Sequence, residues 1–224
     1  MQCWICGDKA DSGEHIIKAS DLKSELGTIN EQEPINAQTA ERTNIRLNSL
    51  KKSHLLKFSK SLCSFCNNAR TQNSDNAWKT LSNHLRNNTE LSRNKKIKLS
   101  NIFSGRKNEH MKWVQLYFTK IFGCVALEES VPIDLSNLGA AILADRACPN
   151  VFLTFGESPF ALFDAGITDI KLGERRHAKY AIWHYYVGSV MVRIMYLDPV
   201  TPNLLPPKAW HPSAKSKYLK IHRL

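Results

Sequence analysis

The sequence predicts an α+β protein in which a small cysteine-bearing module, residues 1–95, precedes an α+β domain with a mainly antiparallel sheet, residues 108–224. Two observations lead to this division. Two pairs of cysteines, each with two residues between the partners, are confined to the start of the chain. From about Asn108, helical apolar repeats are followed by runs of β-branched and aromatic residues, which are typical of strands.

The charge of the chain indicates a class of partner. Its 224 residues carry a formal net charge of +11 at pH 7, shared by both halves. Such an excess favours an anionic partner, most often nucleic acid, although a solvated basic surface without a partner is the alternative. The hydrophobic content of 42% and the charged content of 23% are ordinary for a soluble globular protein.

The start of the chain carries no pattern of a signal peptide, because Met1 is followed by Gln2, Cys3 and Trp4 rather than by a basic and then an apolar stretch. No run of 18 apolar residues is present, so we expect no membrane span and a cytoplasmic protein. In that compartment cysteines stay reduced, and close pairs more often bind metal than each other.

In the first part we expect a helix, a loop, a strand and a second helix, in this order: residues 21–26, 30–44, 54–63 and from 67 onward. Gly27 ends the first helix. In the second helix Trp78, Leu81 and Leu85 lie at helical spacing, and Pro and Gly are absent from residues 67–104.

In the second part we expect two helices, over residues 111–129 and 135–148, and then five strands: residues 150–155, 160–165, 168–173, 178–188 and 189–198. Gly188-Ser189 suits a tight hairpin turn between the last two strands. The aromatic residues of this part suit either stacking on bases or packing in the core: Trp113, Trp183, Tyr185, Tyr186 and Trp210.

The two cysteine pairs, Cys3-Cys6 and Cys63-Cys66, together offer four thiolates. Each pair forms a tight turn that aims two sulfurs at one point, and two such turns complete the tetrahedron that a structural zinc ion prefers. The alternatives are four unligated core cysteines or a redox pair, although no βαβ pattern surrounds either pair. Cys124 and Cys148 lie in apolar surroundings and are expected in the core.

Three further residues would meet if zinc joins the two pairs. Glu14-His15 follows the first pair, and Asn67 directly follows Cys66. A carboxylate and an amide oxygen can hold Mg²⁺, and a histidine beside them can take a proton from water, which is sufficient for phosphodiester hydrolysis. The alternatives are a surface glutamate, a core histidine and an asparagine that only caps the helix.

The stretch CWICG…GEHIIKASDL…LCSFCNNARTQNSDNAW resembles the HNH endonucleases of ββα-metal, treble-clef-like fold, in their zinc-stabilised form with two CxxC pairs, over about residues 3–80. The resemblance implies that His15 is the general base and that Glu14 and Asn67 bind a catalytic Mg²⁺ or Mn²⁺ ion. It also implies that Arg70 contacts a phosphate. Asp75 is a further acidic candidate near the site without an assigned role.

The chain departs from the family pattern just before the second cysteine pair, since the stretch HLLKFSKSLC contains no asparagine to orient the histidine. His54, Ser59 or a backbone carbonyl are the candidates to replace it. The connection between the two halves of the module is also longer than in the family.

The second part matches no motif, and its best basic cluster comprises Arg175, Arg176, His177 and Lys179. This cluster suits contacts with a nucleic-acid backbone or protection of a strand edge. A protein partner for this part is also possible.

The sequence therefore favours a metal-dependent HNH endonuclease, and we expect double-stranded DNA as its substrate and, by family analogy, a bacterial defence system or mobile element as its setting. The alternative is a non-catalytic zinc-dependent nucleic-acid-binding protein. Glu14-His15 separates the two, since binding alone does not require a base beside a carboxylate.

Overall fold

The computed structural model describes residues 1–37, 43–50, 53–87, 96–173, 177–198 and 208–223. Its helices are α1 (Ala19–Leu26), α2 (Gln72–Asn87), α3 (Lys107–Glu128) and α4 (Ser136–Leu143). Its strands are β1 (Ile35–Ala37), β2 (Ile45–Leu47), β3 (Lys96–Lys98), β4 (Val151–Leu172), β5 (Ala178–Leu197) and β6 (Tyr218–Arg223). Short helical turns cover His54–Leu56, Leu99–Asn101 and Pro212–Ala214, and a π-helical turn covers Cys66–Arg70.

The main sheet has the order β3-β6-β4-β5, and β1 and β2 form a separate antiparallel pair. β4 pairs antiparallel with β5 over almost their whole length, β3 pairs antiparallel with β6, and a short parallel stretch joins β6 to β4. The predicted α+β class with a mainly antiparallel sheet is therefore confirmed.

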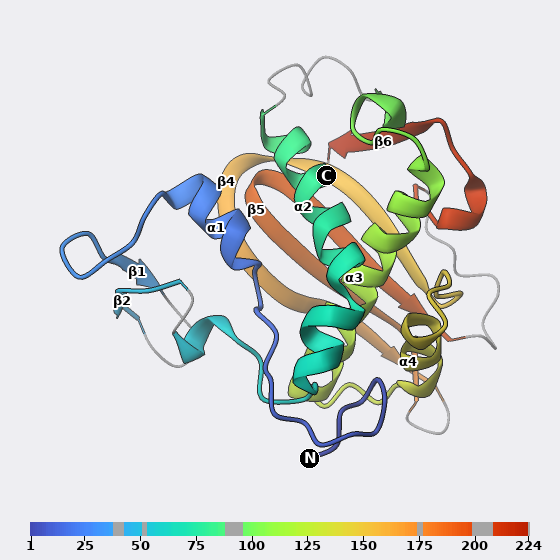
Figure 1. Cartoon of the computed structure of the whole chain (residues 1–224), viewed down its shortest axis with the longest axis horizontal. Coiled ribbons are helices and arrows are strands. Elements are labelled where there is room, and N and C mark those ends of the chain that lie inside the picture. Colours follow the sequence, from blue (N-terminus) through green and yellow to red (C-terminus); the bar gives the residue numbers. More distant parts are fainter. Residues whose placement is uncertain (38–42, 51–52, 88–95, 174–176, 199–207, 224) are drawn as a thin grey trace.

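The long ribbon of β4 and β5 corrects the prediction of five strands. Gly188 lies within β5, next to an irregularity of the pairing rather than in a hairpin turn, because it pairs with Leu162 and the extra residues of the register shift lie in β4, between Glu157 and Leu162. Gly188 has a φ of 60°, which glycine adopts without strain, so the strand continues through the irregularity. The backbone N–H of Asp198 donates to the carbonyl of Lys179 at 2.9 Å, so the two ends of β5 lie side by side. Figure 1 shows the curved ribbon behind α2 and α3.

The core joins residues of both predicted parts in one cluster of buried side chains. Trp78 of α2 stacks on Tyr117 of α3, with ring centroids 5.7 Å apart, and meets Tyr185 of β5 edge to face at the same separation. Trp183 and Tyr185 are buried, as the core interpretation of these aromatics predicts. The expected helices over α2 and α3 are confirmed, with Trp78, Leu81 and Leu85 all buried.

Helix α1 is anchored by a buried carboxylate. Asp21 has no exposed surface, and it accepts hydrogen bonds from Trp78 Nε1 at 2.8 Å and from the Tyr185 hydroxyl at 3.1 Å. The Arg86 guanidinium lies 3.3 Å from the same carboxylate. Gly27 ends the helix, as predicted, with a φ of 75°. These contacts fix the segment before α1, which contributes to the site described below.

Two local predictions were wrong. Residues 30–44 are not all loop, since β1 begins at Ile35 and pairs with β2. The strand expected over residues 54–63 is replaced by the turn at His54–Leu56 and by single bridges, His15 with Lys57 and Ser12 with Leu62. These isolated bridges are too short to form a ladder.

The helices of the described part of the chain include none that is both long and apolar enough to cross a membrane.

Candidate functional site

The four predicted cysteines lie together. The Sγ atoms of Cys3, Cys6, Cys63 and Cys66 are all within 4.8 Å of one another, and none of the four is in a disulfide. Cys6 Sγ and Cys63 Sγ are 3.6 Å apart. Two thiolates of a tetrahedral zinc site are expected about 3.8 Å apart, given the usual Zn–S distance. The cluster could therefore hold a metal ion such as zinc.

The first pair is shaped by the glycine that follows it. The backbone N–H of Gly7 donates to the carbonyl of Cys3 at 2.8 Å, and Gly7 has a φ of 83°. A left-handed glycine at this point lets the chain turn back and point both sulfurs inward. In the second pair, the N–H of Cys66 donates to Cys63 Sγ at 3.4 Å. Burial raises the pKa of the Cys66 thiol, and its cysteine neighbours raise it further, which a bound cation would reverse.

The cysteine cluster brings residues 12–16 against residues 56–62. The N–H of Ser12 donates to the Leu62 carbonyl at 2.9 Å, and the N–H of Phe58 donates to the Glu14 carbonyl at 2.9 Å. Asn67, one residue after Cys66, donates from Nδ2 to Ser12 Oγ at 2.8 Å. The three predicted catalytic residues are thus held by short contacts between segments that are far apart in the sequence.

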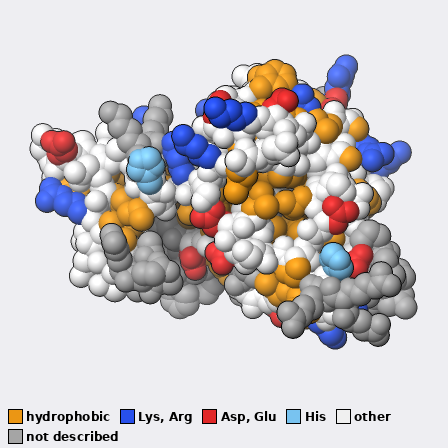
Figure 2. Space-filling view, turned by 90° about the horizontal axis from the view of Figure 1, so that it is seen from below, with side chains coloured by type: hydrophobic (Ala, Val, Ile, Leu, Met, Phe, Trp, Pro, Cys, Tyr) orange, Lys and Arg blue, Asp and Glu red, His pale blue; other side chains and the backbone are white. Residues whose placement is uncertain are grey.

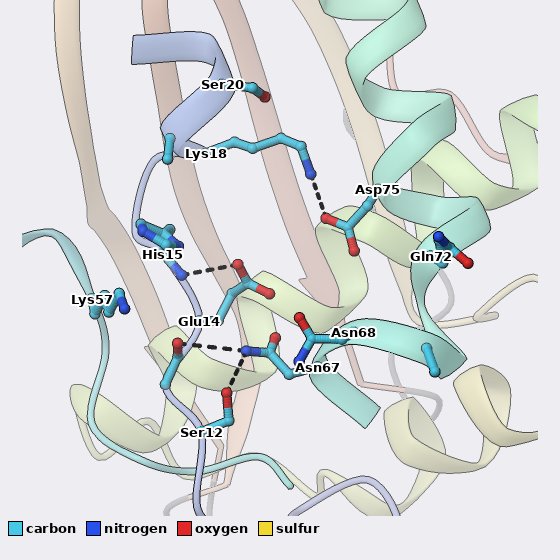
Figure 3. Close-up of a pocket in the computed structure, with 13 residues that line it drawn as sticks. Ser12, Glu14, His15, Lys18, Ser20, Lys57, Asn67, Asn68, Gln72 and Asp75 are labelled. Carbon is cyan, nitrogen blue, oxygen red and sulfur yellow. Dashed lines mark hydrogen bonds and ion pairs between the residues drawn. The ribbon is translucent and has the colours of Figure 1, made fainter. Parts of the chain in front are cut away.

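Glu14, His15 and Asn67 line one open cavity of about 670 Å³. Lys18, Lys57 and Asp75 line it as well. Figure 3 shows the Glu14 carboxylate between His15 and Asn67, with Asp75 on the far side next to Lys18. The site therefore combines a histidine, two lysines, two carboxylates and three amides, those of Asn67, Asn68 and Gln72.

His15 has the properties of a proton acceptor. Its ring is partly buried, and burial is the largest cause of its lowered pKa. The charge of Glu14 raises the pKa, and the charge of Lys57 lowers the pKa further. The Leu50 backbone beside the ring also raises the pKa. Nε2 is buried and has no hydrogen-bond partner among the described residues. The imidazole is therefore neutral at pH 7, with one ring nitrogen available.

Asn67 presents a second buried atom without a partner. Its Nδ2 is held by Ser12, but its Oδ1 is buried and accepts no hydrogen bond among the residues that the structure describes. An amide oxygen left in this way suits a metal ion or a water molecule. Asn67 lies in the π-helical turn rather than at the first turn of α2.

Glu14 is engaged by a residue that the sequence reasoning missed. Glu14 Oε1 accepts the backbone N–H of His15 at 2.9 Å, and Oε2 lies 2.5 Å from Lys120 Nζ. Lys120 comes from α3 and its side chain has no exposed surface. Burial alone would lower the pKa of Lys120, but Glu14 and Asp75 outweigh it and raise the pKa, so the ammonium stays charged.

A signal for Lys120 was present in the sequence. It lies three residues after Tyr117 and four after Leu116, which places it on the apolar stripe of the predicted helix. A lysine in such a position needs a carboxylate partner inside the protein.

Asp75 forms ion pairs with both Lys120 and Lys18. Its Oδ2 lies 3.1 Å from Lys120 Nζ and its Oδ1 lies 2.5 Å from Lys18 Nζ. Burial would raise the pKa of Asp75, but Lys120 and Lys18 outweigh it and lower the pKa. Two carboxylates and two ammonium groups therefore balance in charge beside His15.

Of the three candidates for orienting His15, the side chains of His54 and Ser59 do not serve this role. Ser59 hydrogen-bonds from both its backbone N–H and its Oγ to Glu128, each at 3.1 Å, and so is engaged elsewhere. His54 is exposed. The Leu50 backbone contact is the one found at the ring, as expected of the third candidate, a backbone carbonyl.

The predicted nucleic-acid contacts lie outside the cavity or outside the described residues. Arg70 is exposed, with its guanidinium 5.1 Å from the centroid of the Phe65 ring. Lys179 is partly buried at the start of β5. Arg175 and Arg176 lie outside the described residues. On the face shown in Figure 2, Lys and Arg side chains are scattered among acidic ones, and hydrophobic side chains gather near the centre.

No family model, no curated protein and no solved structure matches this chain.

Proposed function

We propose that the protein is a metal-dependent endonuclease of the HNH type, which hydrolyses phosphodiester bonds with DNA as its substrate. One observation carries the proposal. A neutral histidine shares a cavity with Asn67 and with the ammonium groups of Lys18 and Lys57, and within the described part of the chain the buried His15 Nε2 and Asn67 Oδ1 have no hydrogen-bond partner. A base, an oxygen ligand and cations are the groups that phosphodiester hydrolysis requires.

The residues of the cavity divide the chemistry among them. His15 Nε2 accepts the proton of the attacking water, because its lowered pKa keeps it neutral at pH 7. Lys57 lines the cavity and has no carboxylate partner among the described residues, so it is free to neutralise a phosphate oxygen. In this proposal the Leu50 backbone orients the ring.

The fit to a catalytic metal ion is partial and favours Asn67. Asn67 Oδ1 has no hydrogen-bond partner in the described ranges of the chain, whereas the Glu14 carboxylate is held by Lys120 and by the His15 backbone. A bound Mg²⁺ or Mn²⁺ ion would neutralise the phosphate and the leaving oxygen. Asn67 would hold it, with Glu14 as a second ligand through a lone pair that Lys120 does not use.

The zinc in this proposal is structural. Four thiolates complete its tetrahedron and leave no position for substrate. Its role is to hold residues 12–16 beside Asn67, since the backbone pairings between the two segments are few. The departure from the family pattern, the missing asparagine, is compensated in this proposal by the Leu50 backbone.

A specific observation favours the alternative, a non-catalytic zinc-dependent nucleic-acid-binding protein. Glu14 forms a buried ion pair with Lys120, and this pair gives the carboxylate a structural role that needs no catalysis. The two functions differ in what they require of His15, because binding alone does not require a neutral base in the cavity.

Plasmid cleavage with Mg²⁺ or Mn²⁺ tests the proposal. His15→Ala is expected to reduce the rate by about a hundredfold to ten-thousandfold, the usual contribution of a general base, and added Mn²⁺ should not restore it. Zinc content and affinity for duplex DNA should stay unchanged. The matched control is His54→Ala, which removes an exposed histidine from a nearby turn and should cleave like the wild type.

Two results would count against the nuclease. Undiminished cleavage by His15→Ala would reject the general base. A wild-type protein that binds duplex DNA and leaves the plasmid intact with either metal would favour the non-catalytic alternative.

A further inference from the structure

Four charged side chains alternate in sign across the cavity. Glu14 meets Lys120 at 2.5 Å, Lys120 meets Asp75 at 3.1 Å, and Asp75 meets Lys18 at 2.5 Å. The network has no net charge. A divalent cation added to it would meet two ammonium groups as well as two carboxylates, and the repulsion from the ammonium groups would oppose its binding.

The two ammonium groups are held very differently. Lys120 has no exposed side-chain surface, bridges both carboxylates and lies 3.3 Å from Thr71 Oγ1, so it is fixed in place. The side chain of Lys18 is 19% exposed, and that of its partner Asp75 is 21% exposed. Among the described residues, Asp75 is the one carboxylate that Lys18 contacts. Exchange with another partner is therefore open to Lys18 and closed to Lys120.

Lys18 is also placed to reach a substrate. It precedes α1 at the rim of the cavity, and Figure 3 shows its side chain stretching across to Asp75 on α2. Its charge acts on His15, since Lys18 is among the groups that lower the pKa of that ring. A phosphate that lies next to His15 for hydrolysis would thus compete with Asp75 for the Lys18 ammonium.

We propose that Lys18 is an exchangeable cation: it neutralises Asp75 in the free protein and transfers to the scissile phosphate when DNA binds, which leaves Asp75 Oδ1 to the divalent cation. This inference rests on the proposed nuclease function and adds Asp75 to its metal ligands. It follows that DNA and the divalent cation bind with positive coupling, because each is favoured when Lys18 has left Asp75. By linkage the coupling is equal in both directions.

The test is the binding of Mn²⁺, followed by the electron paramagnetic resonance signal of free Mn²⁺, to the zinc-loaded full chain. All variants carry His15→Ala, which prevents cleavage. Without DNA, Lys18→Met is expected to bind Mn²⁺ about tenfold or more tightly, because it removes a positive charge next to the site. A short duplex should tighten Mn²⁺ binding when Lys18 is present and should tighten Mn²⁺ binding by Lys18→Met by a clearly smaller factor, because only the direct contact between phosphate and cation then remains.

Lys57→Met is the matched control. It removes a second ammonium group from the same cavity, but this group has no carboxylate partner among the described residues. Lys57→Met should weaken duplex binding and keep the coupling between DNA and Mn²⁺. Damage to the fold cannot produce the expected result for Lys18→Met, since an unfolded site would bind Mn²⁺ more weakly rather than more tightly.

Equal or weaker Mn²⁺ binding by Lys18→Met would overturn the inference. If the wild type still cleaves plasmid DNA, that result rejects only the exchange of Lys18. If no variant binds Mn²⁺ and the wild type cleaves nothing, the proposed nuclease function falls together with it.

Discussion

At the scale of single residues, Lys120 is the side chain on which the site most depends. It places a charged ammonium group, without exposed surface, between carboxylates from two other segments of the chain. Removing one partner of a buried ion pair leaves the other charge uncompensated, which costs far more than the pair itself contributes. Glu14 also accepts the N–H of His15, so Lys120 positions the backbone of the proposed base through Glu14.

We expect Lys120→Met to lower the free energy of unfolding by about 3–5 kcal/mol, because Glu14 and Asp75 would be left together without their cation. Urea unfolding followed by circular dichroism measures the change. Lys112→Met is the matched control on the same helix, since Lys112 pairs with Asp145, whose side chain is 57% exposed. That variant should cost at most about 1 kcal/mol. Equal losses in the two variants would contradict the importance of the buried network.

At the scale of elements, the first cysteine pair is packed against helices from the second half of the chain. A Cβ on Gly123 of α3 would overlap the Trp4 indole, and a Cβ on Gly139 of α4 would lie 3.1 Å from the Trp4 carbonyl oxygen. The two glycines therefore leave the space that the CWICG turn occupies. This contact fixes the proposed zinc site relative to α3, the helix that supplies Lys120.

Gly123→Ala is expected to destabilise the protein by about 1–3 kcal/mol, because the added methyl group must displace the Trp4 ring from a packed position. The double variant with Trp4→Ala should lose much less from the glycine substitution, since the ring is then absent. A double-mutant cycle in urea measures this coupling. Additive losses would show that Trp4 is not the neighbour that makes glycine necessary at this position.

At the scale of the whole molecule, three histidines bind protons more weakly in the folded protein than in an unfolded chain. Burial is the largest cause of the lowered pKa of His15, His184 and His222. Their contribution to stability is fully present above the unfolded pKa of about 6.5 and is lost as the pH falls through the lower folded values.

The free energy of unfolding should therefore decrease between pH 7.5 and 5.5, by up to about 1.4 kcal/mol per pH unit for each histidine. Urea unfolding at a series of pH values, with zinc content determined at each, checks the slope. His184→Gln should flatten the slope, because it removes one of the titrating groups. Glutamine keeps an acceptor for the Arg193 Nε–H, which donates to His184 Nε2 at 2.9 Å. A stability that is constant over this range, with zinc retained, would contradict the expectation.

Much of the site was predictable because its signals are local. Two CxxC pairs specify two tight turns, whatever surrounds them, and the structure confirms the cluster that they form. The helices of the core follow from the 3.6-residue period of Trp78, Leu81 and Leu85 and of the apolar stripe in α3. The association of Glu14, His15 and Asn67 in one cavity follows once the cysteines are joined.

The sequence by itself thus determined the cysteine cluster, the main helices and the meeting of Glu14, His15 and Asn67 in one cavity, because each depends on spacing along the chain. Only the tertiary structure decided that Lys120 holds Glu14 and Asp75 and that β5 continues through Gly188. The partners of a buried charge come from distant segments, and whether a glycine ends a strand or bends it depends on the neighbouring strand. Neither property is present in the local pattern of residues.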